Sequence, residues 1–147
     1  MNSPYIIKGN THTDERGVLK YMNDFDMSAI KRFYTIQSAN TKIIRAWQGH
    51  KIESKWFYVL KGTFKIGLVK IDDWDNPSPT LKPEFFTLQA SQHEVLYIPK
   101  GYANGFFALE QDAVLLIYSD HSLDDCKDDN IRFDTDLWVN WEEIKNK

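Results

Sequence analysis

The stretch K-W-F-Y-V-L-K-G-T-F-K-I-G-L-V-K-I, residues 55–71, carries the clearest signal of fold class in the sequence. It contains two runs, residues 55–60 and 63–71, that are rich in the β-branched and aromatic residues typical of β-strands. Between them lies K-G at 61–62, which predicts a tight reversal because glycine adopts turn conformations that other residues resist. The stretch therefore predicts two consecutive strands joined by a turn.

Similar runs continue on both sides of this pair, separated by Gly, Pro, Asn and Asp. They cover residues 31–37, 43–48, 84–89, 94–98, 103–108 and 113–119. Eight or more short strands with turn signals between them favour a β-sandwich or barrel over alternating strands and helices. Residues 72–80 contain two prolines and predict a surface loop, and I-P-K-G at 98–101 predicts a turn.

The C-terminal stretch D-T-D-L-W-V-N-W-E-E-I-K predicts a short helix, because its apolar residues recur at helical spacing. Asp134 or Asp136 can cap its start. Leu137, Trp138, Trp141 and Ile144 would share one face.

Length and composition indicate a single domain over residues 1–147, large enough to bury a core without disulfides. The net charge is −3 and no basic block is present, which argues against a nucleic-acid partner. The one cysteine, Cys126, excludes an intrachain disulfide, and its acidic neighbours weaken it as a nucleophile. The N-terminus has no apolar run flanked by basic residues, so neither a signal peptide nor a membrane span is predicted. We therefore expect a cytoplasmic protein.

Polar residues in R-A-W-Q-G-H-K, residues 45–51, are candidates for a binding site. A sandwich or barrel of this kind, such as a jelly roll, binds small molecules at its open end. Inward-facing polar residues on the central strands are therefore the first candidates for a binding site. Strand alternation puts residues 45, 47 and 49 on one face and residues 48 and 50 on the other. A bulge, which Gly49 permits, would change this assignment.

Several motifs now stand in a recognisable order: D-E-R-G at 14–17, I-K-R-F-Y at 30–34, R-A-W-Q-G-H-K, and L-Y-I-P-K-G-Y-A-N-G-F at 96–106. Over residues 12–136 the chain resembles the cupins that act on nucleotide-linked sugars. These include the dTDP-4-dehydrorhamnose 3,5-epimerases and the dTDP-4-keto-6-deoxyhexose 3,4-ketoisomerases. The resemblance implies an antiparallel cupin jelly roll, or double-stranded β-helix. It also implies a homodimer that isomerises or epimerises a nucleotide-linked 4-keto-6-deoxy sugar, in deoxysugar or surface polysaccharide biosynthesis.

The two branches differ in the first central strand. The epimerases resemble R-G-L-H-Y-Q there, and the ketoisomerases resemble R-G-x-H-A-H-K. Arg45 matches both branches, Gln48 stands at the His they share, and His50 matches the second His of the ketoisomerases. The late Tyr of the epimerases is not evident, although His121 or Ser122 falls near its place.

Both reactions remove a proton from the carbon next to a ketone, so they need a base and donors for the enolate oxygen, and no cofactor. Gln48 cannot accept a proton, whereas His50 can, which makes His50 the candidate base. Tyr34 is a second candidate acid, because a phenol beside Arg or Lys gives up its proton more readily. The candidate substrate-binding residues are Arg16, Arg45, Gln48, Lys55, Asn104 and Tyr102. By the resemblance, Arg16 would contact the nucleotide across a dimer interface in which a strand of each subunit extends the other's sheet.

Two alternatives remain open. A cupin that binds the sugar nucleotide without turnover would fit the missing His, and it is favoured if His50 faces solvent or if Trp47 and Trp56 fill the pocket. A metal-dependent cupin would use the positions of Gln48, His50, Lys55 and Asn104, of which only His50 is a good ligand, so we expect no metal. The remaining histidines, His12 and His93, are expected to be exposed turn residues.

Overall fold

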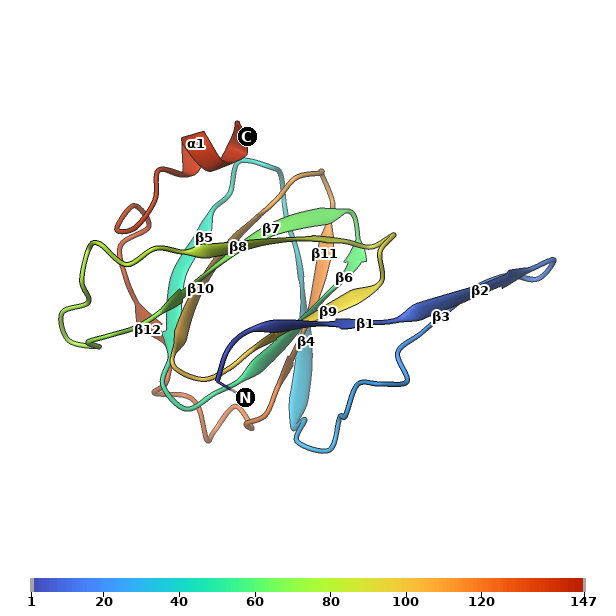
Figure 1. Cartoon of the computed structure of the whole chain (residues 1–147), viewed down its shortest axis with the longest axis horizontal. Coiled ribbons are helices and arrows are strands. Elements are labelled where there is room, and N and C mark those ends of the chain that lie inside the picture. The colour runs from blue at the N-terminus through green and yellow to red at the C-terminus, as the bar shows by residue number, and fades with distance from the viewer. Residues whose placement is uncertain (1, 147) are drawn as a thin grey trace.

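The computed structural model describes residues 2–146, and its regular secondary structure is almost entirely antiparallel strands (Figure 1). One five-stranded sheet has the order β1-β9-β6-β11-β4. Its strands are β1 (Tyr5–Lys8), β9 (Glu94–Ile98), β6 (Lys55–Lys61), β11 (Val114–Ser119) and β4 (Arg32–Gln37). The alternation of strands that are distant in sequence is that of a jelly roll rather than of a simple meander.

The second five-stranded sheet has the order β12-β5-β10-β7-β8. Its strands are β12 (Ile131–Arg132), β5 (Arg45–His50), β10 (Tyr102–Ala108), β7 (Thr63–Lys70) and β8 (Glu84–Gln89). The expected all-β antiparallel cupin fold with a short C-terminal helix is therefore confirmed. The expected strands are present with ends that differ by one or two residues, and Gly62 makes the β6–β7 reversal with a φ of 79°.

The main core lies between the two sheets, because each sheet turns one apolar face toward the other. On β6, Phe57 and Val59 are buried in this core, and alternation puts Lys55 on the same face. On β10, Phe106 belongs to the core, and Asn104 shares its face two residues earlier. Polar residues thus continue the inner faces where the apolar core ends.

A second core packs the C-terminal segment against the outer face of the second sheet. Trp47 lies here, with its ring centroid 5.2 Å from that of Trp138 and 5.3 Å from that of Trp141. Gly67 and Gly105 are directly paired across β7 and β10, and a Cβ on either would meet the Trp47 ring at 3.0–3.1 Å. The two glycines therefore make room for the tryptophan.

The C-terminal helix is shorter than expected. Helix α1 (Trp141–Lys145) begins after Asn140, whose side chain accepts a hydrogen bond from the Glu142 amide. The expected caps Asp134 and Asp136 are wrong, because Trp138 lies in an irregular segment of turns and bends before the helix and packs against the sheet there.

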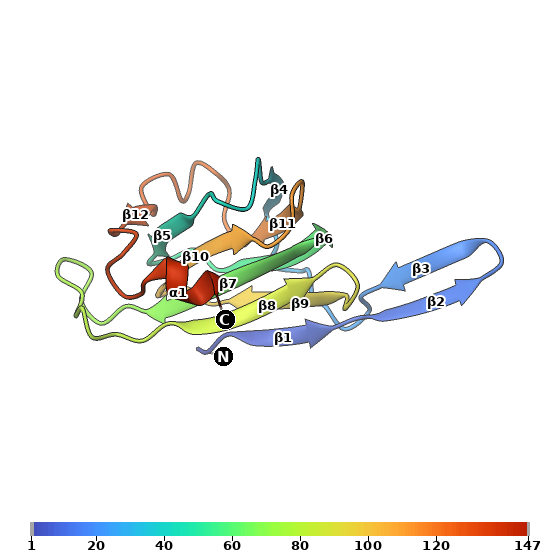
Figure 2. The ribbon, with the colours of Figure 1, turned by 90° about the horizontal axis from the view of Figure 1, so that it is seen from above.

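A hairpin of β2 (Asn10–Asp14) and β3 (Gly17–Tyr21) forms a separate two-stranded sheet. It projects from the body of the molecule like an arm in both views (Figures 1 and 2). His93 fastens its base: the ring Nε2 donates to the Tyr21 carbonyl at 2.7 Å, and Nδ1 pairs with the Tyr58 hydroxyl at 2.5 Å. The expectation that His93 is exposed is wrong, since the hairpin base covers it.

Candidate active site

A row of polar residues crosses the inner face of the first sheet near one end. In the pairing register, Ser119 of β11 stands between Arg32 of β4 and Lys55 of β6. Tyr34 is two residues from Arg32 on the same face, and its hydroxyl accepts a hydrogen bond of 2.8 Å from the Lys55 ammonium. The cations of Arg32 and Lys55 lie 5.0 and 5.5 Å from the Tyr34 ring centroid. Two positive charges therefore surround this phenol.

The second sheet contributes His50, Gln48, Asn104 and Tyr102 at the same end. Tyr102 pairs with His50 and Asn104 pairs with Gln48, so all four share the inner face. The Asn104 side-chain amide donates a hydrogen bond of 3.4 Å to the backbone carbonyl of Gln48. Burial, followed by the nearby Glu84 carboxylate, raises the pKa of Tyr102, which therefore remains a hydroxyl donor at neutral pH.

A bulge in β5 changes one expectation. Phe106 pairs with Arg45 and Asn104 pairs with Gln48, so the two residues 46 and 47 of β5 lie opposite the single residue 105 of β10. The pairing puts Arg45 on the same face as Gln48 and His50, whereas simple alternation put it on the opposite face. The bulge lies before Gln48 rather than at Gly49.

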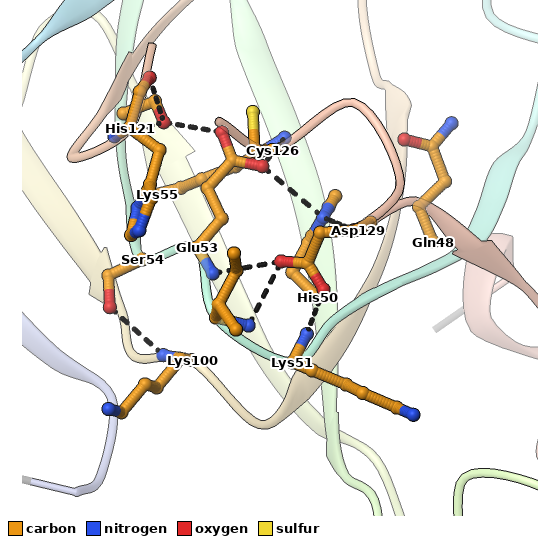
Figure 3. Close-up of polar contacts among 12 residues, drawn as sticks. Gln48, His50, Lys51, Glu53, Ser54, Lys55, Lys100, His121, Cys126 and Asp129 are labelled. Carbon is orange, nitrogen blue, oxygen red and sulfur yellow. Dashed lines mark hydrogen bonds and ion pairs between the residues drawn. The ribbon is translucent and has the colours of Figure 1, made fainter. Parts of the chain in front are cut away.

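Glu53 lies at the centre of the polar cluster, and sequence reasoning did not identify it. Its side chain is 2% exposed. One carboxylate oxygen, Oε2, accepts hydrogen bonds from Arg32 at 2.9 Å and from the Ser119 hydroxyl. The other, Oε1, lies 3.4 Å from His50 Nδ1 and 4.0 Å from the Lys55 ammonium. Figure 3 shows this carboxylate between Lys55 and His50.

Asp129 holds the turn between β5 and β6. Its carboxylate accepts hydrogen bonds from the backbone amides of Lys51, Ile52 and Glu53 at 2.7–2.9 Å. Its backbone carbonyl lies 2.7 Å from His50 Nδ1. Because a carbonyl only accepts, Nδ1 carries a proton and the lone pair of the neutral ring is on Nε2. One residue thus fixes both the turn and the tautomer of His50 (Figure 3).

The His50 ring is electrostatically poised to be neutral. Burial lowers its pKa below 6.5, and the Lys55 charge lowers it further, against the opposing effects of the Asp129 carbonyl and the carboxylates of Glu53 and Asp129. Among residues 2–146, Nε2 of His50 is the one buried side-chain nitrogen or oxygen without a hydrogen-bond partner. A neutral imidazole with an unpaired nitrogen can accept a proton.

The structure brings His50, Tyr34, Lys55, Gln48, Asn104 and Tyr102 to one end of the space between the sheets. Neither tryptophan fills that space: Trp47 packs behind the second sheet, and Trp56 packs on the outer face of the first, against Tyr97. Arg16 is elsewhere, on the projecting hairpin, where it pairs with Asp14 at 2.7 Å. Arg45 is exposed.

The cluster also contains three residue types that bind metals. Ligand atoms of His50, Glu53 and Asp129 lie within 4.8 Å of one another. However, the Asp129 oxygens accept backbone amides, Glu53 pairs with Arg32, and the nearer ring nitrogen of His50 carries a proton. These residues therefore do not fit a metal ion, and the absence of a metal stays a prediction.

Some of the missed residues had a signal in the sequence and others did not. Arg32 is two residues before Tyr34 in an alternating strand, so both had to share a face. Glu53 and Asp129 lie in a turn and in an acidic segment, where no periodicity indicates which side chains turn inward.

A jelly roll with a histidine, a tyrosine and cations at one end of its interior defines a cupin suited to proton transfer. The model of the dTDP-4-dehydrorhamnose 3,5-epimerase family matches residues 1–147, and the chain belongs to this family.

Solved structures agree with this assignment. A variant of the 3,4-ketoisomerase QdtA from Thermoanaerobacterium thermosaccharolyticum, in complex with TDP, is 26% identical with a TM-score of 0.69, over 99% of this chain and 96% of that one. The dTDP-4-dehydrorhamnose 3,5-epimerase of Bacillus anthracis, with TDP and PPi bound, is 19% identical with a TM-score of 0.67, over 82% and 75% of the chains. The TDP-quinovose 3,4-ketoisomerase WlaRB of Campylobacter jejuni is 19% identical with a TM-score of 0.63, over the full length of both. The last two show the fold alone.

No curated protein matches the chain. Within the described residues, no helix is both long and apolar enough to cross a membrane.

Proposed function

We propose that this protein is an isomerase of a nucleotide-linked 4-keto-6-deoxy sugar, with dTDP as the expected nucleotide. The observation that carries the proposal is the buried, unpaired Nε2 of His50, described above, which lies among the other polar residues of the inner face. Family membership and the TDP complex of the related ketoisomerase support the class of ligand.

In the proposed reaction, the lone pair on His50 Nε2 takes the proton from the carbon next to the ketone. The electrons of that C–H bond form a carbon–carbon double bond, and the π electrons of the ketone move to its oxygen, giving an enolate, which hydrogen-bond donors stabilise. Lys55 and Tyr34 are a linked ammonium and hydroxyl that supply such donors, and Tyr34 is the proposed acid that returns a proton. Gln48, Asn104, Tyr102 and Arg45 are proposed to bind the substrate. The proton balance is internal, so the step requires no redox partner.

The test is to incubate the purified protein with a dTDP-4-keto-6-deoxyglucose pool in deuterated water and to follow the sugar signals by NMR. A 3-keto product with deuterium at C4, or deuterium at C3 of the recovered 4-keto sugar beside such a product, both lost in His50→Ala, would support a ketoisomerase with His50 as base. Exchange at C3 and C5 without ketone migration would indicate the epimerase reaction instead.

The alternative is a binding protein that keeps the pocket without turnover, which the glutamine at position 48 favours. No deuterium exchange, together with saturable shifts of the nucleotide signals, would support that alternative. No shifts at all would refute the proposed class of ligand.

We also propose a homodimer in which the β2–β3 hairpin reaches the partner's site. The support is that Arg16 is 82% exposed at its side chain and lies on an arm that projects from the body (Figure 2). Val18 and Leu19 on the same arm are each 60% exposed, which provides apolar surface for an interface. The cytoplasmic location stays a prediction.

Mixing two inactive variants tests this arrangement. In a mixed dimer of Arg16→Ala and His50→Ala, one site combines an intact His50 with an intact Arg16 of the partner subunit. If half of the dimers are mixed and each has one intact site, about a quarter of the wild-type activity returns. No recovery after verified subunit exchange would refute a shared site.

A further inference from the structure

We propose that Glu53 is a positioning residue that orients His50 and balances its charge during proton transfer. The inference rests on the proposed function, because it concerns the base of that reaction. Its basis is geometric: the two oxygens of one buried carboxylate face different groups, as Figure 3 shows.

The Oε2 side of Glu53 is anchored. Arg32 and Ser119 donate to it, and Arg32 is itself held by its Nε, which donates to the His121 carbonyl at 3.1 Å. A buried carboxylate needs such donors because the loss of water costs several kcal/mol per ion unless it is compensated. The anchoring fixes where the second oxygen lies.

The Oε1 side faces the proposed chemistry. It is 3.4 Å from His50 Nδ1, the nitrogen that also donates to the Asp129 carbonyl, and 4.0 Å from the Lys55 ammonium that binds Tyr34. Glu53 therefore contacts the proposed base directly and the proposed acid through Lys55. A carboxylate whose only role was to neutralise Arg32 would not require this second set of neighbours.

The charge of Glu53 matters most when His50 becomes protonated. A proton taken at Nε2 converts the ring to an imidazolium, whose Nδ1 side is then 3.4 Å from a negative oxygen. Lys55 acts in the opposite sense, because its positive charge lowers the pKa of His50 while Glu53 raises it. The charged or titratable groups near the ring are Glu53, Lys55, Asp129, Arg32, Tyr34 and Tyr102.

The experiment is an NMR titration of the His50 ring without substrate, in the wild-type protein and in Glu53→Gln. We expect His50 in Glu53→Gln to titrate at lower pH, because the amide removes the negative charge that stabilises the imidazolium. Glu53→Asp keeps the charge and should restore part of the difference. The matched control is Glu143→Gln, the same change at an exposed carboxylate on α1, and it should leave the His50 titration unchanged.

An unchanged titration in folded Glu53→Gln would overturn the proposal. If that variant does not fold, the wild-type protein still decides, because a carboxylate 3.4 Å from His50 Nδ1 must sense the change in charge when the ring titrates. The carboxyl ¹³C signal of Glu53 should then shift at the pH at which His50 titrates, and the absence of that shift would refute the coupling.

In kinetic assays, Glu53→Gln should lower kcat/KM by about tenfold to a hundredfold, a part of what a general base contributes. The acidic limb of the pH profile should move to lower pH along with the His50 titration. The substrate-free titration tests Glu53 even if the protein does not turn over this sugar. Deuterium exchange tests the reaction itself, so the two proposals fail separately.

Discussion

Lowering the pH should destabilise the protein through His50. The folded protein lowers the pKa of His50 below 6.5, mainly by burial and then by the charge of Lys55. In the unfolded chain the ring titrates near its ordinary value, so below about pH 6.5 the unfolded state binds more protons than the folded state. The free energy of unfolding is therefore highest above that pH and falls as the pH decreases.

The size of the effect follows from a single proton. Uptake of one proton by the unfolded state alone changes the free energy of unfolding by about 1.4 kcal/mol per pH unit. If folded His50 stays neutral, the loss between pH 7.5 and 5.5 is about 1.4 kcal/mol, because protonation of the unfolded chain begins near the middle of that range. The loss stops growing once the pH falls below the pKa of the folded state.

Denaturant unfolding of the wild type and of His50→Asn at several pH values measures this term. The asparagine amide can donate to the Asp129 carbonyl, as the ring does, and does not titrate. His12, His93 and His121 are present in both proteins, so the difference between the two pH slopes isolates His50. Equal slopes would refute the reasoning, even if the variant is less stable at every pH.

Three other changes have defined outcomes. Lys55→Met should lower kcat/KM by about a hundredfold and move the acidic limb of the pH profile to higher pH, because it removes a charge that lowers the pKa of His50; a pH-rate series checks both. Gly105→Ala should reduce the free energy of unfolding by about 1–3 kcal/mol, since the new Cβ would lie 2.7 Å from a neighbouring Cβ and 3.0 Å from the Trp47 ring; denaturant unfolding at pH 7.5 measures it, and an unchanged midpoint would contradict the packing argument. Asp129→Asn should lower the free energy of unfolding by about 3 kcal/mol, because one of the two oxygens that accept the three turn amides is replaced by an NH2 donor. The same denaturant unfolding measures it, and an unchanged midpoint would contradict the role of Asp129 in the turn.

The fold could be predicted from the sequence to the extent that strand alternation and turn residues are local signals. The β6–β7 pair is an example, since its pattern and Gly62 needed no distant information. The bulge in β5 could not be predicted, because it depends on how β5 pairs with β10, and it changed the face assigned to Arg45. The start of α1 was also missed, since Trp138 before it packs against a sheet that is distant in sequence.

The part of the candidate site that lies on strands could be predicted. His50, Lys55 and Tyr34 lie on strands, and the family resemblance together with strand alternation assigned them to one site. Glu53 lies in a turn, and what turns it inward is a carboxylate more than seventy residues away that binds the backbone beside it. Such long-range side-chain contacts leave no periodic trace in the sequence.

Through Asp129, the segment before β12 holds both the turn after β5 and the ring of the proposed base His50. If this segment moved away, the turn amides would lose their acceptor and the His50 ring would lose the carbonyl that fixes its tautomer. In the proposed reaction, the tautomer of His50 that can take a proton at Nε2 is therefore held by a backbone carbonyl 79 residues later in the sequence, in the segment between β11 and β12.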